Sequence, residues 1–295
     1  MSIILAILFS ASLVICFKYF DKYNVNTLHA ILINYVVASI TSYVMADKSS
    51  LPDFSGSWAR IAPFIGMFFI VTFIAMSIAA QKISVIVSII ASKMSLVIPL
   101  SYAVFMLGES MTAFKLLAIL LAMAGVALTV WEDRKTREAK DSHLHGSKAI
   151  LIVCIVFFGS GLVDTSFKYI ESNYYKTVAP QYVMMMCYGG AAVFGWLYFA
   201  FSKTNTFRSI QLKSILSGIL LGVLNYISFF FVLESLHMPG MPSTLVFPVV
   251  NVGVLLVTAL TAMVLFHERL KPLNYAGVVI SIISIALLAW QQYAV

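Results

Sequence analysis

Two ionisable residues, Lys93 and Asp164, lie deep inside long apolar stretches of this sequence. A charged group at the centre of a bilayer costs at least a few kcal/mol unless it is paired or faces a water-filled cavity, so such residues commonly mark binding sites or ion pathways. Lys93 is therefore a candidate contact for an anionic group of a substrate, such as a carboxylate. A structural ion pair, or an apolar segment that ends earlier than expected, would explain Lys93 without a ligand.

Asp164 is open to more than one interpretation. It precedes Lys168 by four residues, so the two side chains can pair on one face of a helix. Lys168 and Lys18 are expected nearer the helix ends, where long basic side chains reach the interface. Asp164 is a candidate proton carrier or a partner for Lys93, and a local pair with Lys168 is the alternative.

Four uncharged polar residues, Tyr35, Tyr188, Asn225 and Asn251, also fall within apolar runs. Each is a candidate for lining a substrate cavity, although hydrogen bonds between neighbouring helices would explain these residues equally well. Ser84, Ser88, Ser92 and Ser95 recur at helical spacing, a pattern typical of close helix packing.

Pro99 and Pro248 are the prolines that lie well inside apolar segments. A proline within a helix frees the carbonyl four residues earlier, so both are candidate hinges, with a simple packing kink as the alternative. Glu109 and Glu268 fall where an apolar segment ends and a short turn begins. There a carboxylate can accept hydrogen bonds from the amides that open the next helix, so we interpret both as structural caps.

These residues must be positioned by membrane-spanning helices. The chain of 295 residues is 61% hydrophobic and only 11% charged, with a mean hydropathy of +0.96. A helix needs about 20 apolar residues to cross a bilayer. Runs of this kind predict an all-α integral membrane protein with ten spans, at 3–20, 28–46, 61–81, 84–107, 113–131, 149–170, 179–201, 211–236, 241–266 and 272–292.

The excess of basic over acidic residues, 19 against 12, reports membrane topology and gives no reason to expect nucleic acid as a partner. Lys and Arg gather in the polar segment 132–148 and in every second turn, which by the positive-inside rule places those turns in the cytoplasm and both termini outside. The three cysteines are widely spaced within apolar runs, so we expect neither a metal site nor a cofactor.

The two halves of the chain repeat each other. The sequence 17–21 (FKYFD) recurs as 167–171 (FKYIE), and Gly108-Glu109 with its following apolar run parallels His267-Glu268 with its own. Five spans per half, an odd number, would make the second copy enter the membrane from the opposite side. The expected domains are a five-helix repeat at 1–131, a polar linker at 132–148 and an inverted repeat at 149–295. Inverted repeats allow alternating access, because the two copies can exchange conformations.

With these motifs, the chain resembles the drug/metabolite transporter superfamily, in particular its ten-helix EamA-like family. The resemblance rests on 99–101 (PLS) followed by Gly108-Glu109 and Gly125, on 247–253 (FPVVNVG) followed by 266–270 (FHERL), and on Gly277. His267 departs from the pattern, since it stands where the first half has glycine. Members of the family are expected to have cytoplasmic termini, which conflicts with the charge distribution, so the orientation stays open.

The resemblance implies a multi-pass protein of the inner cell membrane that moves small metabolites without hydrolysing ATP. Lys93 favours amino acids or other carboxylate-bearing compounds, with export as the favoured direction, whereas Asp164 supports a cationic multidrug exporter as the alternative. An enzyme is disfavoured because no HExxH, GxSxG or Walker A motif occurs, and a channel is disfavoured by the repeat. Expected partners are the substrate, the lipid bilayer, a coupling proton or ion, and a second copy in a homodimer.

Overall fold

The computed structural model describes residues 1–48, 52–107, 113–130, 146–174, 178–201, 210–236, 243–267 and 272–293. All secondary structure in these ranges is helical, as expected for a chain whose backbone polar groups must be satisfied internally in lipid. The helices are α1 (Ser2–Lys22), α2 (Thr27–Met45), α3 (Ser57–Lys82), α4 (Val85–Met94), α5 (Val97–Leu107), α6 (Ala113–Val130), α8 (Ser147–Tyr174), α9 (Pro180–Phe201), α10 (Leu212–Leu236), α11 (Ser243–Leu265) and α12 (Pro272–Tyr293).

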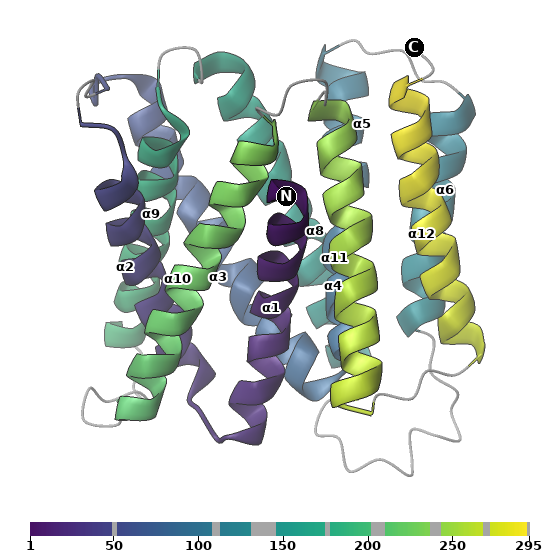
Figure 1. The fold of residues 1–295 in the computed structure, drawn as a ribbon, viewed down its shortest axis with the longest axis horizontal. Coiled ribbons are helices and arrows are strands. Elements are labelled where there is room, and N and C mark those ends of the chain that lie inside the picture. Colours follow the sequence, from purple (N-terminus) through teal and green to yellow (C-terminus); the bar gives the residue numbers. More distant parts are fainter. Residues whose placement is uncertain are drawn as a thin grey trace.

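Six of the described helices are long and apolar enough to cross a membrane, judged by length and composition. They are α1, α2, α3, residues Ser147–Ser166 of α8, α9, and residues Leu212–Val232 of α10. Shorter apolar stretches occur at Val85–Pro99, Gly253–Leu265 and Tyr275–Ser284. The helices form a bundle in which the N-terminal end of α1 and the C-terminal end of α12 lie towards the same side (Figure 1). The prediction of a multi-pass helical membrane protein is therefore confirmed.

The segment expected as one continuous helix at 84–107 is interrupted. Helix α4 ends at Met94, and α5 begins at Val97 after a turn at residues 95 and 96. The Ile98 N–H donates to the Ser95 carbonyl at 2.8 Å, which satisfies the acceptor that Pro99 leaves free in a regular helix. Pro99 consequently sits in the first turn of a new helix, where proline is well tolerated.

Two glycines let α3 and α9 approach each other with their backbones almost in contact. A Cβ on Gly66 would lie 2.3 Å from the Cys187 carbonyl oxygen, and one on Gly190 would lie 2.2 Å from the Pro63 carbonyl oxygen. Only glycine fits at either position, because Cβ atoms do not come within 3 Å of backbone atoms. Close backbone approach through small residues is how helices associate in membranes, where no hydrophobic force drives them together.

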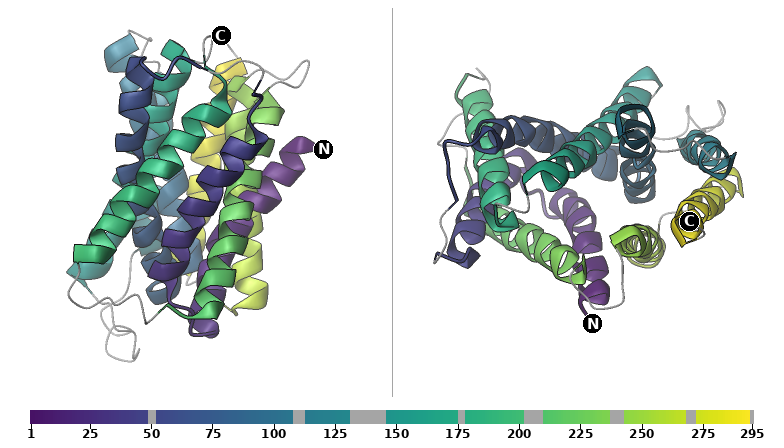
Figure 2. Two further views of the ribbon diagram at one scale, coloured as in Figure 1. Left: turned by 90° about the vertical axis from the view of Figure 1, so that its left-hand side faces the viewer. Right: turned by 90° about the horizontal axis from the view of Figure 1, so that it is seen from above.

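The helices pack in a regular pattern of pairs. Helices α2 and α9 contact each other, α3 contacts α8 and α9, and α10 contacts α1 and α2. Helix α4 packs against α8 and α11, and α1 packs against α11. Helices α6 and α12 lie side by side at one edge of the bundle, where α12 also contacts α11 (Figure 2).

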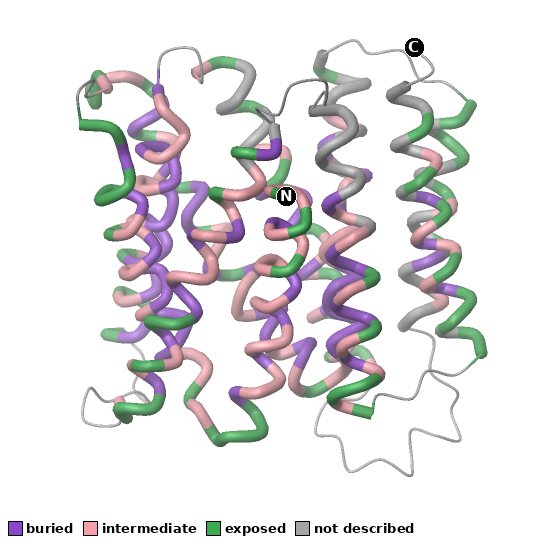
Figure 3. The backbone as a smooth tube through the Cα atoms, viewed as in Figure 1, coloured by how far each residue is buried: buried purple, intermediate pink, exposed green. Residues whose placement is uncertain are grey.

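Buried residues concentrate on the helix sides that face one another, while many large apolar side chains are exposed on the outside (Figure 3). That is the arrangement expected of a bundle surrounded by lipid, because exposed Leu, Ile and Phe cost nothing there. Helix α4 is the most enclosed, since each residue from Val85 to Ala91 is buried. The centre of the bundle therefore contains the helix that carries Lys93.

Candidate functional site

Lys93 lies in the last turn of α4, directly before the interruption of that helix. Its carbonyl accepts hydrogen bonds from the amides of Ser95 and Leu96, the latter at 3.4 Å, so the helix closes with a tight turn. The C-terminal end of a helix carries partial negative charge, which stabilises a nearby cation. The Lys93 side chain is partly exposed although the rest of α4 is nearly closed off. Interrupted helices frame the substrate and ion sites of many transporters.

Helix α8 faces Lys93 through small residues. The Ser160 hydroxyl donates a hydrogen bond of 3.1 Å to the Ser92 hydroxyl. A Cβ on Gly161 would lie 2.2 Å from the Ile98 side chain, so α8 runs very close to the start of α5. These two contacts fix the register between α8 and the interrupted helix. They bring the next turn of α8, which carries Asp164, beside Lys93.

Asp164 is exposed, although it lies within the apolar part of α8, which ends at Ser166. The lipid-facing side of α8 is marked by the exposed residues Leu151, Phe158 and Leu162, which follow helical spacing. Asp164 comes two residues after Leu162 and so points about 200° away from it around the helix. Its exposure is therefore on the inner side of α8. The charges of Lys93 and Asp164 attract each other, but no N–O contact of salt-bridge length joins these two described residues.

Three of the uncharged candidates meet in a separate polar network. The Tyr188 hydroxyl on α9 donates to the Asn225 side-chain oxygen on α10 at 3.2 Å, and the Asn225 amide donates to the Asn34 side-chain oxygen on α2 at 3.2 Å. The Tyr35 hydroxyl donates to the Phe69 carbonyl of α3 at 2.9 Å, and its ring lies 6.1 Å from that of Tyr188. Hydrogen bonds between helices therefore engage all three predicted residues, whatever further role they have.

Asn34 was not among the residues that the sequence singled out. It is fully buried, and its side-chain amide nitrogen has no hydrogen-bond partner among the described residues. A buried unpaired donor is unusual, because it costs about 1–3 kcal/mol. The available signal was its position beside Tyr35, as a second polar residue within the same apolar run.

Of the remaining candidates, Asn251 and Pro248 lie on α11 and Glu109 and Glu268 lie outside the described residues. Asn251 lies on α11, is partly exposed and makes no side-chain hydrogen bond within the described part of the chain. Helix α11 runs without a break past Pro248, in contrast to the interruption before Pro99. Glu109 and Glu268 lie outside the described residues, so the structure does not test them as caps.

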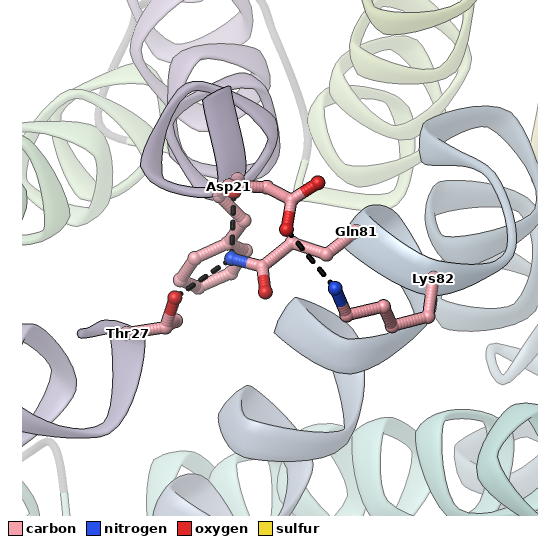
Figure 4. Close-up of polar contacts among 5 residues, drawn as sticks. Asp21, Thr27, Gln81 and Lys82 are labelled. Atoms are coloured by element: carbon pink, nitrogen blue, oxygen red, sulfur yellow. Dashed lines mark hydrogen bonds and ion pairs between the residues drawn. The ribbon is translucent and has the colours of Figure 1, made fainter. Parts of the chain in front are cut away.

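A second polar cluster closes the end of the bundle where the turns between α1 and α2 and between α3 and α4 lie. Lys82 on α3 forms an ion pair of 3.1 Å with Asp21 on α1. The Gln81 amide donates to the Phe17 carbonyl at 2.8 Å and to the Thr27 hydroxyl at 2.7 Å, which joins three helices (Figure 4). Next to these contacts is a polar depression of about 450 Å³, lined by Phe20, Asp21, Asn24, Val25, Asn26, Gln81 and Gln211.

The fold and the charges within apolar helices define the class first: a multi-pass helical membrane protein with charged residues on helices of the bundle. Comparison with known proteins shows what the chain is similar to. Residues 1–131 match the EamA-like transporter family, which is part of the drug/metabolite transporter superfamily. The match confirms the resemblance predicted from the sequence. Among the described residues, no group of three or more His, Cys, Asp or Glu is placed to hold a metal ion.

Relatives extend over the whole chain. An uncharacterized protein of Haemophilus influenzae is 26% identical over 294 residues, which cover 96% of each chain. A solved crystal structure aligns with 99% of this chain and 96% of its own, with a TM-score of 0.65 and 12% sequence identity. At that identity the structural likeness concerns the fold alone.

Proposed function

We propose that this protein is a secondary transporter of small carboxylate-bearing metabolites, such as amino acids, in the inner cell membrane. Lys93 would contact the substrate carboxylate. The observation that carries the proposal is the position of Lys93, a partly exposed cation at the end of the enclosed helix α4, next to an interruption of that helix. The EamA-like match over residues 1–131 supports transport as the activity. Export is the favoured direction.

We further propose that the transporter works by alternating access between inverted repeats at 1–131 and 149–295, joined by the linker 132–148. Counting α4 and α5 as one span gives ten spans, which pair as α1 with α8, α2 with α9, α3 with α10, α4–α5 with α11, and α6 with α12. Exchanging the members of each pair turns the contact of α3 with α9 into that of α10 with α2. In the same way, the contact of α1 with α10 becomes that of α8 with α3. The contact of α1 with α11 becomes that of α8 with α4 and α5. This near-symmetry of helix contacts supports two equivalent halves.

A second function, export of cationic drugs, is favoured by one observation. Asp164 is more exposed than Lys93 and faces the inside of the bundle, so an organic cation could bind to its carboxylate. In that case Lys93 would be a structural counter-charge. The two functions differ in the charge that the ligand carries. Removal of the Lys93 charge should therefore weaken binding of a carboxylate but not binding of a cation.

Thermal unfolding of the detergent-purified protein distinguishes the two functions. The ligands are amino acids, organic acids, nucleotide sugars and cationic drugs, each added to wild type and to Lys93→Met. A ligand that binds only the folded state stabilises it by about 2.7 kcal/mol at a hundredfold excess over its dissociation constant. We expect stabilisation by carboxylates in the wild type and none in Lys93→Met.

The matched control is Lys48→Met, which removes an exposed lysine near the end of α2 and should respond to carboxylates as the wild type does. Equal stabilisation of wild type and Lys93→Met by carboxylates would rule out Lys93 as the anion contact. Stabilisation by cations alone would establish the second function in place of the first.

A further inference from the structure

Lys93 and Asp164 form a pair of opposite charges whose charged atoms do not come within ion-pair distance. They come from different helices, α4 and α8, and the Ser92–Ser160 hydrogen bond holds those helices together one turn away from Asp164. The two side chains attract each other without direct contact of their charged atoms. The exposed Asp164 lies on the inner side of α8, so its carboxylate is accessible from within the bundle.

No other charge on the neighbouring helices competes for Asp164 among the described residues. Helix α8 packs against α3, α4 and α5. The titratable or charged residues of these helices are Lys93 on α4, Tyr102 on α5, and Arg60 and Lys82 near the two ends of α3. On α8 itself, Lys168 follows one turn later. Among the described side chains of these helices, Lys93 is the one that acts electrostatically on Asp164.

Charge balance restricts what the pair can hold. With no ligand, Lys93 and Asp164 neutralise each other. A monocarboxylate bound to Lys93 leaves one uncompensated negative charge, which is costly away from bulk water. A proton taken from water onto the Asp164 carboxylate, which forms the neutral acid, removes that charge. A proton without the anion would instead leave Lys93 uncompensated.

We propose that Asp164 is the proton-coupling residue, and that a monocarboxylate and one proton bind and cross together. The inference rests on the proposed function, since Lys93 is taken as the anion contact. Two states of the site are neutral, one empty and one carrying both anion and proton, and these are the states that reorient across the membrane. Because the anion and the proton cross together, no net charge moves. Efflux of a metabolite that accumulates in the cell is then independent of the membrane potential.

Zwitterions provide an internal contrast. An amino acid brings an ammonium group for Asp164 and a carboxylate for Lys93, so the site is neutral without an added proton. Transport of an amino acid should therefore be independent of a pH gradient, whereas transport of a monocarboxylate should follow it.

The test uses purified protein in liposomes of phosphatidylethanolamine and phosphatidylglycerol, with radiolabelled pyruvate, L-lactate and D-gluconate as probes. Counterflow, in which unlabelled probe inside exchanges for labelled probe outside, needs no net proton movement. Accumulation is then driven by a pH gradient of one unit, acid outside. We expect counterflow in wild type and in Asp164→Asn, because the amide imitates the protonated acid. We expect about tenfold accumulation in wild type and none in Asp164→Asn.

Three controls make the outcome specific. Asp164→Glu keeps a titratable acid and should retain the pH-driven accumulation, which also guards against a folding defect of Asp164→Asn. Glu234→Gln removes an exposed acid of α10 and should behave as the wild type. Clamping the membrane potential with valinomycin and potassium should leave the wild-type accumulation unchanged.

The inference is overturned if Asp164→Asn accumulates the probe as the wild type does, or if the wild type shows counterflow but no pH-driven accumulation. Absence of counterflow with all three probes overturns it as well. The proposed function fails in a different experiment: thermal unfolding would then show no ligand stabilisation that depends on Lys93. The two failures are therefore distinguishable.

Discussion

The Ser160 hydroxyl of α8 donates a hydrogen bond of 3.1 Å to the Ser92 hydroxyl of α4. Ser92 lies one residue before Lys93, and Ser160 lies one helical turn before Asp164. The two serines set the separation of the two charged side chains. Side-chain hydrogen bonds between membrane helices contribute about 0.6 kcal/mol on average. Their effect on geometry is therefore expected to exceed their effect on stability.

Ser160→Ala should lower the free energy of unfolding by about 1 kcal/mol or less, because one hydrogen bond between helices is lost. The apparent affinity for a carboxylate should fall by a larger factor, since α8 would no longer be held in register with Lys93. Thermal unfolding with and without ligand measures both quantities. Ser166→Ala, on the same helix and without a side-chain hydrogen bond to a described residue, is the matched control. Unchanged ligand affinity in Ser160→Ala would argue against a positioning role.

Gly190→Ala should destabilise the protein strongly, because its Cβ would lie 2.2 Å from the Pro63 carbonyl oxygen of α3. Overpacking of this kind costs about 1–3 kcal/mol. The adjacent Gly189 is a close control, since a Cβ there would meet only the Ser39 hydroxyl, at 3.3 Å. Unfolding midpoints of Gly189→Ala and Gly190→Ala in the same detergent give the comparison. Equal midpoints would show that α3 and α9 do not cross at this glycine.

Asn225→Leu should be destabilising because it leaves two buried groups without a partner, the Tyr188 hydroxyl and the Asn34 side-chain oxygen. Each unsatisfied buried group costs about 1–3 kcal/mol. Asn251→Leu removes an asparagine that makes no side-chain hydrogen bond to a described residue, so its cost should be smaller. A double-mutant cycle with Tyr188→Phe measures the coupling directly, and additive effects would contradict the network.

Asp21→Asn should change stability by less than about 1 kcal/mol, since both members of the Lys82–Asp21 ion pair are about two-fifths exposed, at 42% and 41%. Its effect on transport should be larger. The pair ties α1 to α3 at one end of the bundle, so its loss should make that end open more readily and raise the counterflow rate.

Reversal of the charges, in the double variant Asp21→Lys with Lys82→Asp, should return the counterflow rate towards the wild-type value. If Asp21→Asn leaves the rate unchanged, the ion pair has no part in opening that end.

The sequence alone determined which segments form long apolar helices. Hydropathy is a local property of about 20 consecutive residues, so the expected spans agree closely with the helices; 28–46, for example, corresponds to α2 at Thr27–Met45. The rarity of charge in apolar runs likewise drew attention to Lys93 and Asp164, and the motifs led to the EamA-like family.

Only the tertiary structure decided which residues meet. Tyr188, Asn225 and Asn34 lie far apart in the chain and come together because α2, α9 and α10 pack against one another. The helix breaks after Met94, where the Ile98 N–H donates to the Ser95 carbonyl that Pro99 leaves free. The same sequence is also compatible with a continuous, kinked helix. Helix crossings follow from close backbone approach at residues such as Gly66 and Gly190. A hydropathy profile contains no information about which helix lies on the other side.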